Sequence, residues 1–361
     1  MKTGVELLRQ FHANDGKRYA VIEGNRDCNR SCSYCVVPKK YNRATEATLD
    51  ETKRTVDWLY GQGYRMLSYL GGEPLAPYQT REGITFFDHT VGIVEHAASK
   101  GMLVNVTTNG DYADPDKIKA LRAAGLDTLS FSLHTYSKVG LDHLLKEAQL
   151  SAEAGVIPTV QVVFTRERTR QLPGIAAYIA RHGVLFSAGL VQEKGGDFSS
   201  GSQGESKIPT PDEQKEVFDA LLLLKDFGFV RNNRNYLTHA PQYFPNNWTC
   251  DPSRDTFLHI GAGGTVDVCS DVRSTLTTND IGNLDNPNWR TLKRNLVANC
   301  GNCMFHCYYE VENPELVGDL PTAAVVFLIK ARRLNAVKAI GNFAVKVAEK
   351  RNKKVDWQLG I

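Results

Sequence analysis

The stretch RYAVIEGNRDCNRSCSYC, residues 18–35, joins a short apolar run to a loop that holds three cysteines. The apolar half, residues 18–24, is rich in Val and Ile, as expected for a parallel strand that is buried on both faces. Loops at the carboxyl ends of such strands commonly carry the chemistry of α/β proteins. A strand followed at once by three thiols therefore predicts an α/β sheet with a metal site at its carboxyl edge.

Further apolar runs follow along the chain, and helical patterns lie between them. These runs are residues 65–70, 103–108, 127–133, 158–165 and 184–192. Consecutive strand–helix units build parallel sheets with right-handed crossovers. Because six units are too few for a closed eight-stranded barrel, we expect a partial, TIM-like (β/α)6 barrel. One helix should begin near Leu49, where Thr48 and Glu51 have the spacing of a capping box.

The strand–helix pattern breaks near residue 195, where a polar segment rich in Gly and Ser begins. Such a segment is typical of a linker or a long loop. We expect a barrel over residues 1–230 with this loop at about 195–210. A small Cys-rich domain should follow over 231–320, and a basic helix over 321–361.

The 361-residue chain has the composition of a folded protein. Hydrophobic residues make up 42% of it, which is enough to build a core. Eight cysteines are too sparse for a disulfide scaffold, and their clustering favours metal chemistry in a reducing compartment. The chain shows no secretory signal and no run of about 18 uncharged apolar residues. We therefore expect a cytoplasmic location.

The three cysteines of the first loop follow a Cys-x3-Cys-x2-Cys spacing. Thiolates at this spacing can bind three corners of a [4Fe–4S] cluster, which normally takes four protein ligands. One iron would then stay open to a small ligand. Zinc is the alternative, although its sites favour paired Cys-x2-Cys units. A redox dithiol would need only Cys32 and Cys35.

The loop resembles the signature of the radical S-adenosylmethionine (SAM) superfamily, Cys-x3-Cys-x-aromatic-Cys. Cys28, Cys32, Tyr34 and Cys35 match it in full. The resemblance implies that SAM is the fourth ligand of a [4Fe–4S] cluster, held through its amine and carboxylate. It also implies that Tyr34 lies near the adenine.

Other matches to this superfamily fall at the ends of the later strands. Gly71, Gly72, Glu73 and Pro74 resemble its GGEP motif, which receives the SAM amine; glycine permits close backbone approach, and Glu73 can accept hydrogen bonds from an ammonium. The resemblance implies further SAM contacts at Asn109, Ser132, His134 and Gln161. Gln161 departs from the pattern, because many relatives carry Asn there. His134 would be either a SAM contact or an ordinary polar residue at a strand end.

The remaining cysteines lie in the last third of the chain, at Cys250, Cys269, Cys300, Cys303 and Cys307. Their spacing resembles the SPASM/twitch extension of radical SAM enzymes, which holds auxiliary [4Fe–4S] clusters. The full pattern has seven cysteines, so five imply one auxiliary cluster. Cys250 and Cys269 would be ligands, joined by a hairpin that Gly264 permits, and two of the other three would complete the set. A structural zinc knuckle is the alternative.

The fifth distal cysteine would then be spare. It would be either a plain buried thiol or a hydrogen-atom donor to a substrate radical, which makes Cys307 a catalytic candidate. Gln192 and Glu193 lie at the end of the sixth apolar run, where they are candidate substrate contacts or ordinary polar residues at a strand end. Glu193 is the second catalytic candidate.

The charge of the chain is concentrated at its C-terminal end. Residues 321–361 contain nine Lys and Arg but two Asp and Glu, a net charge of +7, against −4 for the remainder. Apolar residues recur there at helical spacing. The amphipathic helix that we expect would either dock on the barrel or contact an anionic membrane surface. We expect no nucleic-acid binding, because the body is mildly acidic and no RNA-binding motif is seen.

The superfamily resemblance implies reductive cleavage of SAM to a 5′-deoxyadenosyl radical, with electrons from a donor such as flavodoxin or ferredoxin. We expect the radical to take hydrogen from a small biosynthetic intermediate of the sugar, nucleoside or lipid type. The auxiliary cluster would aid electron transfer or hold substrate. A peptide-modifying enzyme of the RiPP-maturation type is the alternative. Such enzymes often carry a recognition domain before the first strand, and only some seventeen residues precede that strand here, which disfavours this alternative without removing it. A non-catalytic iron–sulfur or zinc protein is the alternative of another class.

Overall fold

The computed structural model describes residues 19–32, 35, 37, 42–134, 136–191, 208–243, 247–300, 306–314 and 316–359. The chain divides into two compact units, each assembled from separate stretches. Unit 1 comprises Met1–Thr128, Gly196–Phe198 and Thr249–Asn302, and unit 2 comprises Leu129–Gly195, Ser199–Trp248 and Cys303–Ile361.

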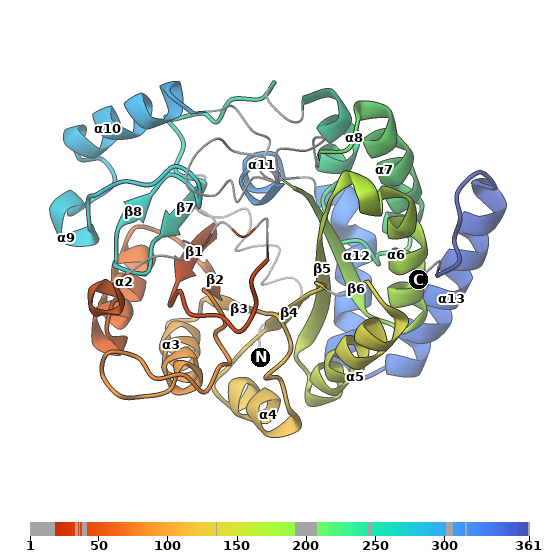
Figure 1. Cartoon of the computed structure of the whole chain (residues 1–361), viewed down its shortest axis with the longest axis horizontal. Coiled ribbons are helices and arrows are strands. Elements are labelled where there is room, and N and C mark those ends of the chain that lie inside the picture. The colour runs from red at the N-terminus through yellow and green to blue at the C-terminus, as the bar shows by residue number, and fades with distance from the viewer. Residues whose placement is uncertain are drawn as a thin grey trace. The chain divides into compact units, whose positions relative to one another are not determined.

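Unit 1 is built on a largely parallel sheet with strand order β3-β2-β1-β7-β8. The strands are β1 (Tyr19–Glu23), β2 (Met66–Leu70), β3 (Leu103–Thr108), β7 (Phe257–Ile260) and β8 (Val266–Asp267). Only β8 runs antiparallel to its neighbour among these strands. The helices are η1 (Arg43–Thr45), α2 (Leu49–Gly61), α3 (Phe86–Ser99), α4 (Pro115–Ala123), α9 (Thr278–Ile281) and α10 (Pro287–Ala298) (Figure 1).

Unit 2 contains the strands β4 (Thr128–Ser132), β5 (Ile157–Phe164) and β6 (Leu185–Leu190), in the order β4-β5-β6, with β5 and β6 parallel. The helices before the 192–207 gap are α5 (Lys138–Ala154), η2 (Arg166–Gln171) and α6 (Leu172–Arg181). Those after it are α7 (Pro211–Lys225), α8 (Arg234–Tyr243), α11 (His306–Glu312), α12 (Leu316–Lys330) and α13 (Leu334–Arg351) (Figure 1).

The six apolar runs form β1 to β6 close to the expected positions, which confirms the α/β fold class. Helices connect the strands along the chain, as a parallel sheet requires. In the part of the chain that the structure describes, the sheets are open rather than closed, in keeping with a partial barrel. The capping box is present, because the Thr48 hydroxyl accepts from Glu51 N and the Glu51 carboxylate accepts from Thr48 N.

The segment after residue 231 contributes two short strands to the sheet of unit 1. Strand β7 pairs in parallel with β1, placing Ile260 beside Ile22. Strand β8 folds back on β7 through a turn in which Gly264 has a φ of 81°. The hairpin expected at Gly264 is therefore present. Glycine suits this turn because it adopts the left-handed conformation without steric cost.

The basic tail forms two helices rather than the one expected. They are α12 and α13, separated by a turn in which Arg332 has a φ of 56°. Helix α13 packs closely on α6, since a Cβ at Gly341 would lie 1.9 Å from the carbonyl oxygen of Ala180. Among the described residues, no helix has the length and apolar character needed to cross a membrane.

Candidate functional site

The cysteine loop of unit 1 is bonded through its backbone to the turn that follows β2. Gly24 N donates to Leu70 O at 2.7 Å. Further along, Gly72 N donates to Asn25 O, and Glu73 N donates to Asp27 O, both at 2.8 Å. The ladder between β1 and β2 therefore continues past the strand ends, and it fixes the segment that leads into Cys28.

The two glycines of this turn are required by the approach of the neighbouring backbone. A Cβ at Gly72 would lie 2.0 Å from Asp27 O, and one at Gly71 would lie 2.6 Å from Asn25 O. Such contacts are too short for any side chain. The glycine pair therefore lets the cysteine loop lie directly against this turn.

The Glu73 carboxylate lies at the centre of the site and is fully buried. Its Oε1 accepts from Thr108 Oγ1 at 2.6 Å and from Leu75 N at 2.9 Å, and its Oε2 accepts from Asn109 N at 2.7 Å. Burial raises the pKa of Glu73, while these three hydrogen bonds favour the charged form. In this structure the carboxylate joins the ends of β2 and β3.

The loop after β3 also contacts the cysteine loop. Asn109 Nδ2 donates to Asn29 Oδ1 at 2.8 Å and lies 3.7 Å from Cys28 Sγ. The Asp111 carboxylate accepts from Asn29 Nδ2 at 2.6 Å and from Arg30 Nε at 2.8 Å, and it forms an ion pair with the Arg30 guanidinium. Two loops that are distant in sequence therefore hold the segment from Cys28 to Arg30.

The three thiols of the loop share one electrostatic environment. Burial raises the pKa of Cys28 and of Cys32, and the charges of the neighbouring thiolates raise both further, whereas Arg30 lowers the pKa of Cys32. Bound iron supplies positive charge, which favours the thiolate form of such groups. The donor set therefore fits a [4Fe–4S] cluster.

Within the described residues, no group of three His, Cys, Asp or Glu side chains is arranged to hold a single metal ion. A cubane cluster is larger than one ion, and its thiolate ligands lie correspondingly further apart.

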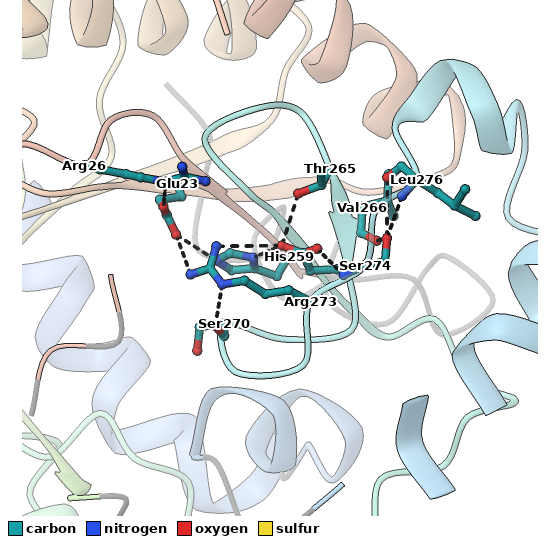
Figure 2. Close-up of polar contacts among 10 residues, drawn as sticks. Glu23, Arg26, His259, Thr265, Val266, Ser270, Arg273, Ser274 and Leu276 are labelled. Atoms are coloured by element: carbon teal, nitrogen blue, oxygen red, sulfur yellow. Dashed lines mark hydrogen bonds and ion pairs between the residues drawn. The ribbon is translucent and has the colours of Figure 1, made fainter. Parts of the chain in front are cut away.

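A second polar cluster of unit 1, absent from the sequence predictions, connects β1 to the β7–β8 hairpin (Figure 2). Glu23, which is 1% exposed, accepts from Arg26 Nε at 3.1 Å and from a terminal guanidinium nitrogen of Arg273 at 2.8 Å. His259 Nδ1 lies 3.3 Å from Asp267 Oδ2, and its Nε2 lies 4.0 Å from Glu23 Oε2. The buried carboxylates of Glu23 on β1 and Asp267 on β8 therefore flank His259 on β7, and two part-buried arginines contact the Glu23 carboxylate.

This cluster adjoins two of the cysteine-bearing segments of unit 1. Arg26 is two residues before Cys28, and Arg273 Nε donates to Ser270 O at 3.0 Å, directly after Cys269. Its only sequence signal is an acidic residue at the end of an otherwise apolar strand, together with polar residues flanking Gly264. The partners Glu23 and Arg273 lie 250 positions apart in the chain, so sequence spacing does not pair them.

The other candidate residues are distributed over both units. Cys250, Cys269 and Cys300 belong to unit 1, and Cys269 is buried. Unit 2 holds Ser132 at the end of β4, His134 two residues later, Gln161 within β5, and Cys307 on α11. The candidates outside the described residues are Tyr34, Gln192, Glu193 and Cys303.

Cys307 belongs to a half-buried polar group of unit 2. Its Sγ lies 3.2 Å from His306 Nε2. Burial raises the pKa of Cys307 to about 12 and lowers the pKa of His306 to about 4. Both groups are therefore neutral near pH 7, and the thiol keeps its S–H bond. Glu310, which lies on the same helix α11 as Cys307, accepts a hydrogen bond from Asn232 Nδ2 at 2.8 Å.

Comparisons with known proteins identify the family of this site. Residues 22–149 match the Radical SAM superfamily, and this range contains the cysteine loop and Glu73. The GTP 3′,8-cyclase of Chlorobaculum tepidum is 31% identical over 120 residues, which cover 33% of this chain and 34% of the cyclase. The PqqA peptide cyclase of Bradyrhizobium diazoefficiens is 26% identical over 166 residues, which cover 43% of this chain and 41% of that protein.

A solved structure with the same fold is that of Streptococcus suis SuiB bound to its precursor peptide SuiA. It superposes with a TM-score of 0.57 at 15% identity, covering 80% of this chain and 70% of SuiB. The chain spans 34% and 41% of the lengths of the two curated relatives above. The chain thus carries a domain of the Radical SAM superfamily over residues 22–149.

Proposed function

We propose that this protein is a SAM-dependent radical enzyme that modifies a peptide. The radical part rests on the three-thiol loop and on its backbone attachment to the turn after β2. The peptide part rests on the relatives, since several PqqA peptide cyclases and SuiB with its precursor peptide are among them. This substrate class replaces the sugar, nucleoside or lipid intermediate favoured by sequence alone.

The residues of unit 1 would hold the cofactors in the following way. Cys28, Cys32 and Cys35 would ligate three irons of a [4Fe–4S] cluster, and SAM would ligate the fourth. Glu73 would act by ordering the loop from Thr108 to Asn109, because its oxygens already accept hydrogen bonds there. When bound, the cluster and SAM supply a radical that removes a hydrogen atom from a substrate carbon.

An auxiliary [4Fe–4S] cluster in a twitch-like arrangement is part of the proposal. Cys250, Cys269 and Cys300 lie in one unit, and the hairpin before Cys269 is formed. Cys303 or Cys307 would supply the fourth thiolate. The thiol left over would be Cys307 if Cys303 is the ligand, and its neutral S–H group suits hydrogen-atom donation. A one-electron donor such as flavodoxin or ferredoxin is required.

A nucleotide substrate is the second candidate, because the GTP 3′,8-cyclase has the higher identity over its matched segment. The test uses the anaerobically reconstituted protein with SAM, a reductant, and either GTP or a synthetic short peptide encoded beside its gene. We expect 5′-deoxyadenosine with the peptide, together with a change in peptide mass. Product from GTP alone would favour the second candidate. No 5′-deoxyadenosine above a protein-free control under any condition would contradict radical SAM activity.

A further inference from the structure

Helix α12 in unit 2 is apolar on both its buried and its exposed side. Its sequence, LVGDLPTAAVVFLIK, contains only two charged residues. Val325 and Ile329 are buried, 2% and 0% exposed. A helix that is hydrophobic all round is normally covered on every side.

The exposed side of α12 forms one continuous apolar stripe. Every exposed residue of this helix whose side chain the structure describes is apolar: Val317, Leu320, Ala324 and Phe327. Their spacing puts them on one face, over about 15 Å of helix. Val317 is 76% exposed, Leu320 51% and Phe327 65%. Large exposed residues gathered in this way mark a surface that contacts another body.

Exposed positive charge follows this stripe in the chain, on the turn after α12 and on α13. We use the term tail surface for the α12 stripe, Phe343 and the exposed basic residues that follow α12. These basic residues are Arg332, Arg333, Lys346, Lys350, Arg351, Lys353 and Lys354. In the described part of the chain, none of the seven pairs with an acidic side chain, and the acidic residue of α13, Glu349, pairs with Arg181 at 2.7 Å.

The second helix repeats the combination of apolar and basic positions. Phe343 is 59% exposed, and Lys346 and Lys350 follow it at intervals of three and four residues, on the same helical face. The opposite face of α13 is fixed against α6 at Gly341. Helix α13 therefore holds its aromatic and basic side chains outward on a rigid support.

We propose that the tail surface seats this protein on an anionic lipid surface, with the α12 stripe and Phe343 in the interface and the cations against lipid phosphates. Interfacial helices combine apolar side chains with Lys and Arg in this way. A second copy of the chain fits less well, since seven unpaired cations on each copy would repel. Nucleic acid would satisfy the cations but would leave the apolar stripe in water.

The test is co-sedimentation of the full chain with vesicles of phosphatidylcholine alone or with added phosphatidylglycerol. We expect binding to the anionic vesicles at low salt and its loss at high salt, because exposed charges are screened within about 8 Å at 0.15 M. Arg332→Gln with Arg333→Gln should weaken binding about fivefold for each residue. The matched control is Lys146→Gln with Arg170→Gln, which removes two exposed, unpaired charges elsewhere on unit 2.

The apolar part is tested with Phe327→Ser, which should weaken binding about tenfold. Val139→Ser is its control, because Val139 is 80% exposed on α5. Equal binding to both vesicle types, no binding at low salt, or equal effects of test and control variants would overturn the proposal. A concentration-dependent dimer that Phe327→Ser abolishes would also overturn the proposal. So would binding of an acidic protein, but not of vesicles, to the tail surface. None of these binding experiments depends on the radical activity, so their failure is distinguishable from a failure of the proposed function.

Discussion

At the scale of single residues, Gly72 controls how closely the cysteine loop approaches the turn after β2. A Cβ at this position would lie 2.0 Å from Asp27 O, which is a backbone atom and cannot rotate away. Gly72→Ala should therefore displace the loop and destabilise the protein by about 1–3 kcal/mol. The reconstituted variant should also lose iron. Thermal unfolding and iron analysis measure the two effects.

Gly61 provides the control for that substitution. It ends α2, and a Cβ there would meet no atom within 4 Å. Gly61→Ala should leave the iron content unchanged and stabilise the protein slightly, by about 0.5–1 kcal/mol. Equal behaviour of the two variants would mean that the close backbone approach at Gly72 has no importance.

Glu310 should make stability depend on pH. Burial raises its pKa from 4.5 to about 7, although Asn232 donates to the carboxylate. The folded state therefore binds a proton more tightly than the unfolded state, so stability falls as pH rises from about 4.5 to about 7. Glu310→Gln should flatten this dependence in urea unfolding measured across that range. Glu153→Gln, an exposed control on α5, should leave the slope as it is.

At the scale of elements, the ion pair of Glu23 with Arg273 joins β1 to the β7–β8 hairpin. Arg273→Met leaves a carboxylate that is 1% exposed, with Arg26 hydrogen-bonded to it and His259 at 4.0 Å. Removing one partner of a buried pair costs about 3–5 kcal/mol, and Arg26 should keep the loss at the lower end. Adding Glu23→Gln should restore part of the stability. Denaturant unfolding measures both.

Arg254 supplies the comparison for Arg273. Its pair with Asp251 is exposed, at 55% and 44% for the two side chains. Arg254→Met should therefore change the free energy of unfolding by about 0–1 kcal/mol. If Arg273→Met were equally mild, the buried cluster would not support the hairpin.

The packing of α13 on α6 depends on Gly341. A Cβ there would lie 1.9 Å from Ala180 O, so Gly341→Ala should force the helices apart and cost about 1–3 kcal/mol. Asn342→Ala, at the next and exposed position, should stay within about 0.5 kcal/mol. Thermal unfolding of both variants distinguishes tight docking from loose association.

Short-range patterns in the sequence predicted what local chemistry fixes. Buried Val, Ile and Leu runs marked β1 to β6, and Thr48 with Glu51 marked the start of α2. Long-range pairings were not predictable, because no local signal sets β7 beside β1 or Arg273 beside Glu23. The break between α12 and α13 was missed since Arg332 adopts a left-handed conformation that its residue type does not favour.

The cysteine loop itself was predictable, whereas its supports were not. Spacing alone singled out Cys28, Cys32 and Cys35. The hydrogen bonds that hold the loop come from Asn109 and Asp111, which depend on where β3 ends in space. The contact of Glu73 with the SAM amine stays a prediction, and in this structure its carboxylate accepts hydrogen bonds from Thr108, Asn109 and Leu75.

At the scale of the whole molecule, the proposed function requires two iron–sulfur sites that are bound by separate sets of cysteines. The most direct test compares iron and 5′-deoxyadenosine in the intact protein and in a Cys28→Ala/Cys32→Ala/Cys35→Ala variant. The intact protein should hold about eight irons after anaerobic reconstitution and should cleave SAM. The variant should keep about four irons and form no 5′-deoxyadenosine. Zinc in either site, or SAM cleavage by the variant, would contradict the account.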